Sequence, residues 1–243
     1  MSARTYEAVF FDVGGTLMWI EPSADEIWAR ALAAHGHRVT AEDVTNRTAV
    51  SGPEVNRADL HRAMMDTTAA IGGEFPATME EQRPFFRRFD SAVREHLGIP
   101  VQEELLNTVE RMFAEEIVTH KFDNVDSTLR SLKREGYRLG VISNASHELP
   151  ERLEQLGVVH HFDAITYSWE VGAEKPDSQI FRVALDRLDV DPQQAVHVGD
   201  SYDADVLGAR DVGITPMLID RDGSTQSIDC IVLRSLTEVA EYL

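Results

Sequence analysis

The chain has 243 residues, of which 43% are hydrophobic, and this is enough apolar material for a buried core. Its formal net charge of −19 at pH 7 argues against nucleic acid and against an anionic membrane as partners. The single cysteine, Cys230, excludes an internal disulfide, and no run of about 20 apolar residues is present, so we expect a cytoplasmic protein.

The first predicted element is a buried strand over residues 8–11, which ends at Asp12. Gly14, Gly15 and Thr16 follow at once. A buried strand that ends in a carboxylate and a flexible turn places that carboxylate at the carboxyl edge of a parallel sheet, where open α/β folds hold their ligands. Glycines at this point let the backbone approach an ion or a phosphate closely.

A long insert follows over residues 21–118, and its apolar spacing predicts helices without strands. The expected helices cover about 24–35, 41–51, 54–70, 78–97 and 102–118. We therefore expect an inserted all-helical domain with a small core of its own.

After residue 122 the pattern changes to alternating helices and strands, with strands expected near 139–143, 164–166, 195–199 and 215–219. Repeated β–α units predict a doubly wound parallel sheet with helices on both faces. Residues 1–20 and 119–243 should together form this α/β core domain, and 21–118 the inserted domain. The two passages between them, near 17–21 and 119–124, should form a hinge.

Three later stretches place polar side chains at the same edge of the predicted sheet as Asp12. The second strand ends in Ser143 and Asn144, Lys175 opens a helix, and a further strand runs into Asp200. Carboxylates here would hold a divalent cation, and the serine and lysine would bind an anion beside it.

These four stretches, in this order and spacing, resemble the four motifs of the haloacid dehalogenase-like (HAD) hydrolase superfamily. The resemblance covers the core on both sides of the insert. It implies a Rossmann-like HAD core with a helical cap domain, and a phosphatase-like hydrolase that acts on a small phosphorylated metabolite.

The resemblance also implies roles for individual residues. Asp12 occupies the position of the nucleophile, which attacks phosphorus to give an aspartyl-phosphate. Ser143 and Lys175 are the other expected catalytic residues. Both would contact the phosphoryl group, together with the backbone of Asn144 and with Thr16.

A Mg²⁺ ion is the implied cofactor. Its expected protein ligands are Asp12, Asp200 and the main-chain carbonyl of Gly14, because Mg²⁺ prefers oxygen ligands and retains several waters. Asp205 is expected to support the metal site without binding directly. Asp203 is expected to be a solvated residue at a helix start.

The sequence departs from the family pattern at Gly14. Phosphatases of this superfamily usually carry a second aspartate there, which protonates the leaving group and then activates water. General acid–base help is worth about 10²–10⁴-fold, so we expect restricted or slow hydrolysis of esters and anhydrides with good leaving groups. The alternative is a catalytically impaired HAD-fold protein that binds a phosphorylated ligand or a partner protein.

Two pairs of neighbouring residues are candidates to replace the missing acid or to bind a metal. His147 and Glu148 follow Ser143 closely, although a helix-start or surface role is expected for both. The pair His160 and His161 has no partner at ligand spacing and is expected at the surface.

Other branches of the superfamily fit less well. Dehalogenases do not keep the aspartate at position 200, and phosphonoacetaldehyde hydrolases need a cap lysine, which residues 21–118 do not contain. Phosphoglucomutase-type transfer needs the acid that Gly14 replaces. The sequence leaves the oligomeric state undetermined, because periodicity does not separate an exposed apolar face from a buried one.

Overall fold

The computed structural model describes residues 5–40, 54–56, 59–60, 63, 67, 79–100, 103–223, 225 and 229–243. The described residues divide into two compact units. The first unit contains residues 5–19 and 120–243, and the second unit contains the described residues between 20 and 119. The helix predicted over 41–51 lies outside the described residues.

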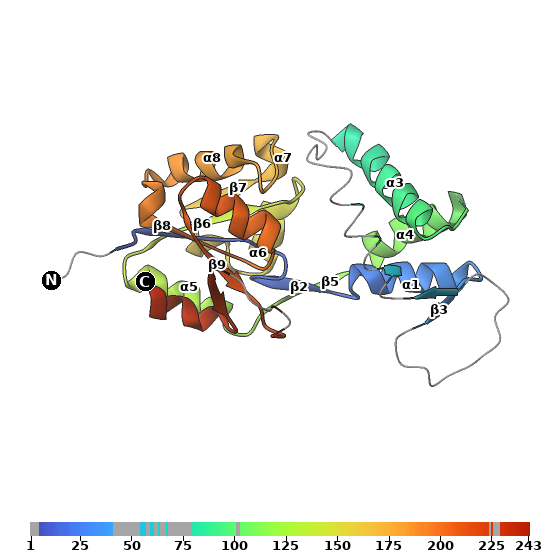
Figure 1. Cartoon of the computed structure of the whole chain (residues 1–243), viewed down its shortest axis with the longest axis horizontal. Helices are drawn as coiled ribbons and strands as arrows, with labels where there is room; N and C mark the ends of the chain where they lie inside the picture. Colours follow the sequence, from blue (N-terminus) through green and yellow to red (C-terminus); the bar gives the residue numbers. More distant parts are fainter. Residues whose placement is uncertain are drawn as a thin grey trace. The chain divides into compact units, whose positions relative to one another are not determined.

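A six-stranded parallel sheet forms the centre of the first unit, in the order β10-β9-β8-β1-β6-β7 (Figure 1). Its strands are β1 (Ala8–Phe11), β6 (Arg138–Ser143), β7 (Ala164–Tyr167), β8 (Ala195–Gly199), β9 (Thr215–Ile219) and β10 (Ile231–Leu233). The predicted parallel sheet is confirmed, and β10 is an additional edge strand.

The register of β1 brings the motif residues to one edge of this sheet. Phe11 aligns with Val141 on β6 and with Val198 on β8. Asp12 directly follows β1, Ser143 is the last residue of β6, and Asp200 directly follows β8. Their side chains therefore start from neighbouring points on the carboxyl edge.

Helices cover both faces of the sheet, as alternation along β1 requires. Val9 and Phe11 belong to an apolar core that includes Leu129 and Leu132 of α5 (Val125–Arg134). The intervening residues of β1 pack in a separate core with the apolar face of α8 (Ser178–Leu188). Figure 1 shows α8 and α5 on opposite sides of the sheet.

Shorter helices complete the first unit. They are α6 (Leu149–Gln155), α7 (Ser168–Val171), α9 (Gly208–Asp211) and the 3₁₀ helices Val159–His161, Pro192–Gln194 and Leu236–Tyr242. A π-helical turn, Tyr202–Leu207, begins shortly after β8, beyond Asp200 and Ser201. Such turns often occur at functional sites, and this one carries Asp205.

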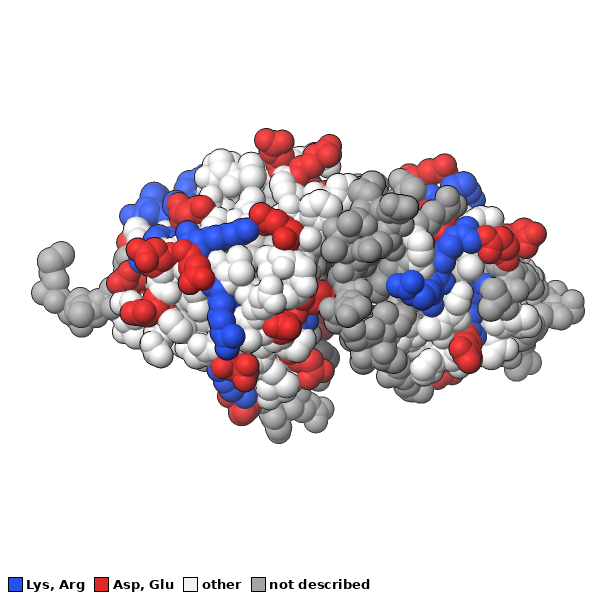
Figure 2. All heavy atoms as spheres, turned by 90° about the horizontal axis from the view of Figure 1, so that it is seen from above, with Lys and Arg blue, Asp and Glu red and all other residues white. Residues whose placement is uncertain are grey.

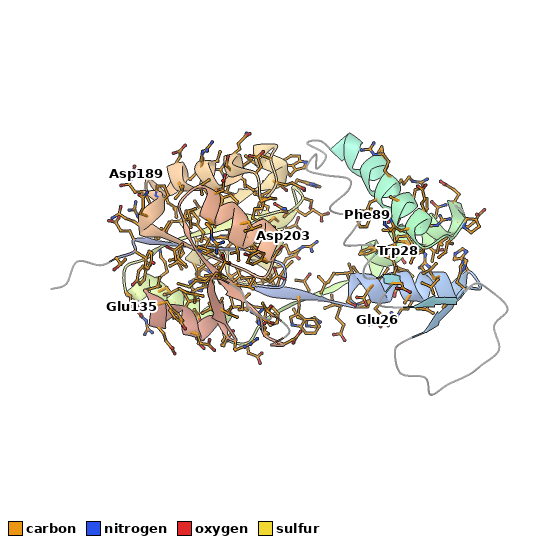
Figure 3. All side chains as sticks on the ribbon, viewed as in Figure 1. Glu26, Trp28, Phe89, Glu135, Asp189 and Asp203 are labelled. Atoms are coloured by element: carbon orange, nitrogen blue, oxygen red, sulfur yellow. The ribbon has the colours of Figure 1, made fainter. Side chains whose placement is uncertain are left out.

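The second unit is built from α1 (Ala24–Ala34), α3 (Met79–His96) and α4 (Glu103–Glu115). Trp28 of α1 is fully buried in its core, and Phe89 of α3 packs against the same core (Figure 3). These three helices agree with the predicted ones.

Two short strands, β3 (Arg38–Thr40) and β4 (Glu54–Asn56), pair in parallel within the second unit. The prediction of an insert with helices alone is therefore wrong at these two places. Each strand has three residues, which is too short for an alternating pattern to appear in the sequence.

The chain passes between the units through a two-stranded ribbon. Its strands are β2 (Met18–Glu21) and β5 (Val118–Lys121), which coincide with the two predicted hinge passages. Within the first unit, the ring of Trp19 stacks on His120 with centroids 4.4 Å apart.

Asp90 on α3 should make the stability of the second unit dependent on pH. Burial, together with the charge of Glu110, raises the pKa of Asp90 to about 7. Because the folded state binds the proton more tightly than the unfolded state, stability should fall as pH rises from about 4 to about 7. Asp90→Asn should remove this loss and stabilise the protein by roughly 2–4 kcal/mol at about pH 8.

Urea unfolding at about pH 5 and about pH 8 measures this difference. Glu95→Gln on the same helix changes an exposed carboxylate and is the matched control. An equal response of the two variants at both pH values would contradict the assignment to Asp90.

Charged side chains are mixed on the surface. On the face drawn in Figure 2, Lys and Arg lie interspersed with Asp and Glu over both units. Among the described residues, no helix combines the length and apolar character needed to span a bilayer.

Candidate active site

Asp12 lies almost completely buried, with 6% of its surface exposed. Its Oδ1 accepts a hydrogen bond from Ser143 Oγ at 3.1 Å and another from Lys175 Nζ at 2.7 Å. Three residues from distant parts of the sequence thus meet at one carboxylate oxygen. Both contacts restrict rotation of the Asp12 side chain.

Lys175 bridges two carboxylates. Besides Asp12, its Nζ contacts Asp205 Oδ1 at 2.6 Å. Asp205 Oδ1 also lies 2.9 Å from His197 Nε2, and its Oδ2 accepts the Ser201 N–H at 3.0 Å. Both oxygens of Asp205 are therefore engaged by protein groups.

Asn144 holds the backbone of Lys175. Its Oδ1 accepts the Lys175 N–H at 2.7 Å, and its Nδ2 donates to the Lys175 carbonyl at 3.0 Å. The Asn144 side chain therefore fixes the segment that carries the lysine. The predicted contact of Asn144 with substrate involves its main chain, and it stays a prediction.

The site contains three aspartates around one buried lysine. Burial would lower the pKa of Lys175, but Asp12 and Asp205 raise it above its usual range. Burial would raise the pKa of Asp205, but Lys175 and His197 lower it below its usual range. The Lys175 ammonium therefore compensates the negative charge of Asp205 more fully than that of the other two aspartates.

The charges of Asp12 and Asp200 are less well compensated, so both carboxyl groups hold a proton more tightly than usual. Burial raises the pKa of Asp12, and Lys175 only partly opposes this rise. Burial and the charges of Asp12 and Asp205 raise the pKa of Asp200 to about 7. The Asp200 side chain is nevertheless accessible to solvent, so a cation can reach it.

These three aspartates could hold a metal ion. Asp12, Asp200 and Asp205 each offer one carboxylate oxygen, and the three oxygens lie within 4.8 Å of one another. Carboxylate oxygens suit Mg²⁺, and a cation would offset the excess negative charge. Because both Asp205 oxygens already have partners, Asp12 and Asp200 are the better placed direct ligands.

Two glycines permit the close approach of these aspartates. Gly15 has a φ of +68°, and a Cβ at this position would lie 1.9 Å from Asp200 Oδ2. A Cβ at Gly199 would lie 2.0 Å from Cγ of Asp205. Side chains at either position would displace a carboxylate from the site.

Gly14 and Thr16 differ from Gly15 in their surroundings. A Cβ at Gly14 would meet no atom within 4 Å, and its φ lies outside the left-handed region. Thr16 is fully buried, and its hydroxyl has no hydrogen-bond partner among the described residues. Contact of Thr16 with substrate stays a prediction.

The other candidate acids have structural contacts. The His147 ring packs against Trp169 with centroids 5.5 Å apart. Glu148 occupies the N-cap position of α6 without a side-chain capping bond, and it accepts a hydrogen bond from Arg152 at 3.4 Å. Asp203, labelled in Figure 3, is exposed as expected.

The expectation of a surface position for His161 is wrong. His160 is exposed, but His161 is buried with its ring 4.0 Å from that of His160. The 3₁₀ helix that carries both residues packs against α5, and this turns one of the two rings inward.

Comparison with known proteins identifies the family. The model of the haloacid dehalogenase-like hydrolase family matches residues 6–213. The chain belongs to this family. HAD-like hydrolase domain-containing protein 3 of Mus musculus is 30% identical over 216 residues, which cover 86% of this chain and 80% of that protein.

Two further HAD-like proteins illustrate the range of similarity. A glyceraldehyde 3-phosphate phosphatase of Methanothermobacter thermautotrophicus is 39% identical over 131 residues, or 50% of this chain and 58% of that protein. The magnesium-bound HAD-hydrolase YfnB of Bacillus subtilis has the same fold, with a TM-score of 0.68, 21% identity and 98% of each chain covered.

Two residues of this HAD-like site were not predicted. His197 contacts Asp205, and Arg221 binds the loop after Asp12. His197 is the one polar side chain in the buried strand β8, which is a usable signal. Arg221 follows β9 at the carboxyl edge of the sheet, beside an Asp-Gly turn signal.

Proposed function

We propose that the protein is a phosphatase that hydrolyses a small phosphorylated metabolite, with Asp12 as the nucleophile. The observation that carries this proposal is the fixation of Asp12 Oδ1 by Ser143 and Lys175, next to Asp200. The similarity to a glyceraldehyde 3-phosphate phosphatase supports a small phosphorylated substrate.

The proposed reaction has two displacements at phosphorus. A carboxylate oxygen of Asp12 attacks phosphorus, the bond to the leaving oxygen breaks, and that oxygen takes the electron pair. Water then attacks the aspartyl-phosphate, which releases phosphate and restores the carboxylate. The ammonium of Lys175 stabilises the negative charge on the phosphoryl oxygens, and the hydroxyl of Ser143 donates a hydrogen bond to the same group.

Mg²⁺ is the proposed cofactor, held by Asp12, Asp200 and the Gly14 carbonyl. When bound, it neutralises charge on the phosphoryl oxygens and on the nucleophile. Asp205 supports the site by holding Lys175. The excess of three carboxylates over one ammonium supports the presence of a cation here.

The second unit is proposed to act as a cap. In this proposal residues 21–118 form the cap domain, and residues 1–20 with 119–243 form the catalytic core. A closing cap would exclude water and strengthen charge interactions at the site. One cysteine in the whole chain supports a reducing, cytoplasmic location.

Phosphate release from a graded panel of substrates tests the function. Acetyl phosphate, p-nitrophenyl phosphate and a sugar phosphate need increasing help from a general acid. We expect Mg²⁺-dependent turnover that falls steeply along this series and stops with chelator. Equal turnover of sugar and aryl phosphates would exclude a limitation by the missing acid.

Gly14→Asp should restore general acid catalysis. The position has free space and an ordinary φ, so an aspartate can be accommodated. We expect turnover of a sugar phosphate to rise by about 10–100-fold, with little change for acetyl phosphate. Gly14→Asn has the same shape without the acidic proton, so it should give no such gain.

Gly14 is also the observation that favours the alternative, a protein that binds phosphorylated ligands without turnover. In that case, beryllium fluoride or aluminium fluoride would bind together with Mg²⁺, as phosphoenzyme and transition-state mimics do. No phosphate would be released from any member of the panel.

A further inference from the structure

Arg221 lies next to the loop that follows the proposed nucleophile. Its Nη1 donates to the Gly15 carbonyl, and its Nη2 donates to the Thr16 carbonyl at 2.7 Å. The guanidinium thus binds two successive peptide groups with its two terminal nitrogens. A planar fork of donors is suited to such a pair of acceptors.

The remaining hydrogen bonds of this loop show what depends on Arg221. The Val13 carbonyl accepts the N–H groups of Leu17 and Met18, and the Met18 carbonyl accepts the Gly15 N–H. The Leu17 carbonyl accepts the Phe122 N–H at 3.2 Å. Among the carbonyls of residues 15–18, only those of Gly15 and Thr16 rely on a side chain.

The Gly14 carbonyl takes no part in this network, since no described residue donates to it. A peptide group is planar, so the direction of one carbonyl constrains its neighbours in a tight loop. By fixing the next two carbonyls, Arg221 limits the directions that remain open to the Gly14 carbonyl. That carbonyl is the proposed main-chain ligand of Mg²⁺.

Arg221 is itself held in place from two sides. Its guanidinium carbon lies 3.6 Å from the centroid of the Phe122 ring, which shields it from water. Asp220 fixes the segment that carries it, because its carboxylate accepts the N–H groups of Gly223 and Thr225 at 3.0 Å and Nη1 of Arg234 at 2.7 Å. The hydrogen bonds of a shielded guanidinium are stronger than exposed ones.

We propose that Arg221 is a positioning residue that orients the loop after Asp12, and with it the Gly14 carbonyl, for metal binding and phosphoryl transfer. The inference rests on the proposed function. Arg221 acts through backbone carbonyls and does not itself contact the reacting atoms.

Arg221→Met tests this inference. Loss of both hydrogen bonds should raise the Mg²⁺ concentration for half-maximal activity by about tenfold and lower kcat by about 10–100-fold. KM for p-nitrophenyl phosphate should change by less than about threefold. Arg221→Lys offers a single ammonium in place of the fork and should fall between Met and the unchanged protein.

Arg138 provides a matched control. Its guanidinium also binds two successive carbonyls, those of Leu188 and Asp189, but at the start of β6 and away from the site. Unlike Arg221, it forms an ion pair as well, with Glu7. Arg138→Met should cost comparable stability and leave kcat and the Mg²⁺ requirement unchanged.

Hydrogen exchange separates this inference from the proposed function. In Arg221→Met, the amides of Leu17 and Met18 should exchange at least about tenfold faster, while Arg138→Met should not affect them. This readout remains valid if the unchanged protein hydrolyses no phosphate, an outcome that would overturn the function alone. If Arg221→Met leaves both the hydrogen exchange of the Leu17 and Met18 amides and the Mg²⁺ requirement unchanged, the positioning role is wrong. Arg221→Lys serves the same measurements if the Met variant does not fold.

Discussion

Gly15→Ala is expected to lower kcat/KM for p-nitrophenyl phosphate at least about 100-fold. The new Cβ would lie 1.9 Å from Asp200 Oδ2, so either the loop after Asp12 or the Asp200 carboxylate must move. The backbone at this position also has a φ of +68°, which strains any residue with a side chain. Steady-state kinetics as a function of Mg²⁺ concentration measures the loss.

Two glycine controls separate collision from strain. Gly157 has a φ of +71° with open space around it, so Gly157→Ala introduces strain alone, in the turn after α6. Gly14→Ala adds a Cβ with neither strain nor collision, and its loss should stay within about tenfold. A loss in Gly157→Ala as large as that in Gly15→Ala would indicate that collision with Asp200 is not the cause.

Lys175→Met is expected to affect both activity and stability. The substitution leaves Asp12 and Asp205 buried without their shared partner. Removal of one member of a buried ion pair costs about 3–5 kcal/mol, and activity should fall at least about 10³-fold. Urea unfolding and phosphate release measure the two effects.

The stability loss in Lys175→Met should depend on pH. Lys175 lowers the pKa of Asp205, so its contribution is present above the unfolded pKa and is lost as pH falls. The difference from the unchanged protein should therefore stay constant down to about pH 4 and shrink as the pH is lowered further. A pH-independent difference would contradict the electrostatic account.

Lys133→Met is the control for loss of a lysine ion pair. Lys133 Nζ lies 2.6 Å from Asp163 Oδ1, but both side chains are about one third exposed. Exposed pairs contribute at most about 1 kcal/mol, so this variant should retain activity and most of its stability.

The sequence allowed prediction of those parts of the site that local pattern and sheet topology determine. Asp12, Ser143 and Asp200 end or follow buried strands, and parallel strands bring their carboxyl ends together. Lys175 could be added because its stretch matches a family motif. Ser143 and Lys175 both donate to Asp12 Oδ1, which agrees with their expected position at the same edge of the sheet.

The parts that the sequence did not reveal depend on side-chain direction or long-range contact. The Asn144 side chain binds the backbone of Lys175, 31 positions away, and nothing in the sequence indicates this contact. Arg221 donates a hydrogen bond to the Thr16 carbonyl although the two residues are 205 positions apart. The hydrophobic periodicity of a sequence does not indicate such a long-range contact. The strands β3 and β4 are held by pairing with each other, which a three-residue pattern cannot indicate.

The ribbon of β2 and β5 bears on how this molecule could diversify. The chain leaves the first unit on β2 and returns to it on β5, and these two strands are paired. The two ends of the segment between them are therefore close to each other. Because the ribbon is separate from the six-stranded sheet, a change of length between β2 and β5 need not alter the register of that sheet. The segment between β2 and β5 could then change in evolution while the carboxylates at the edge of the sheet keep their scaffold.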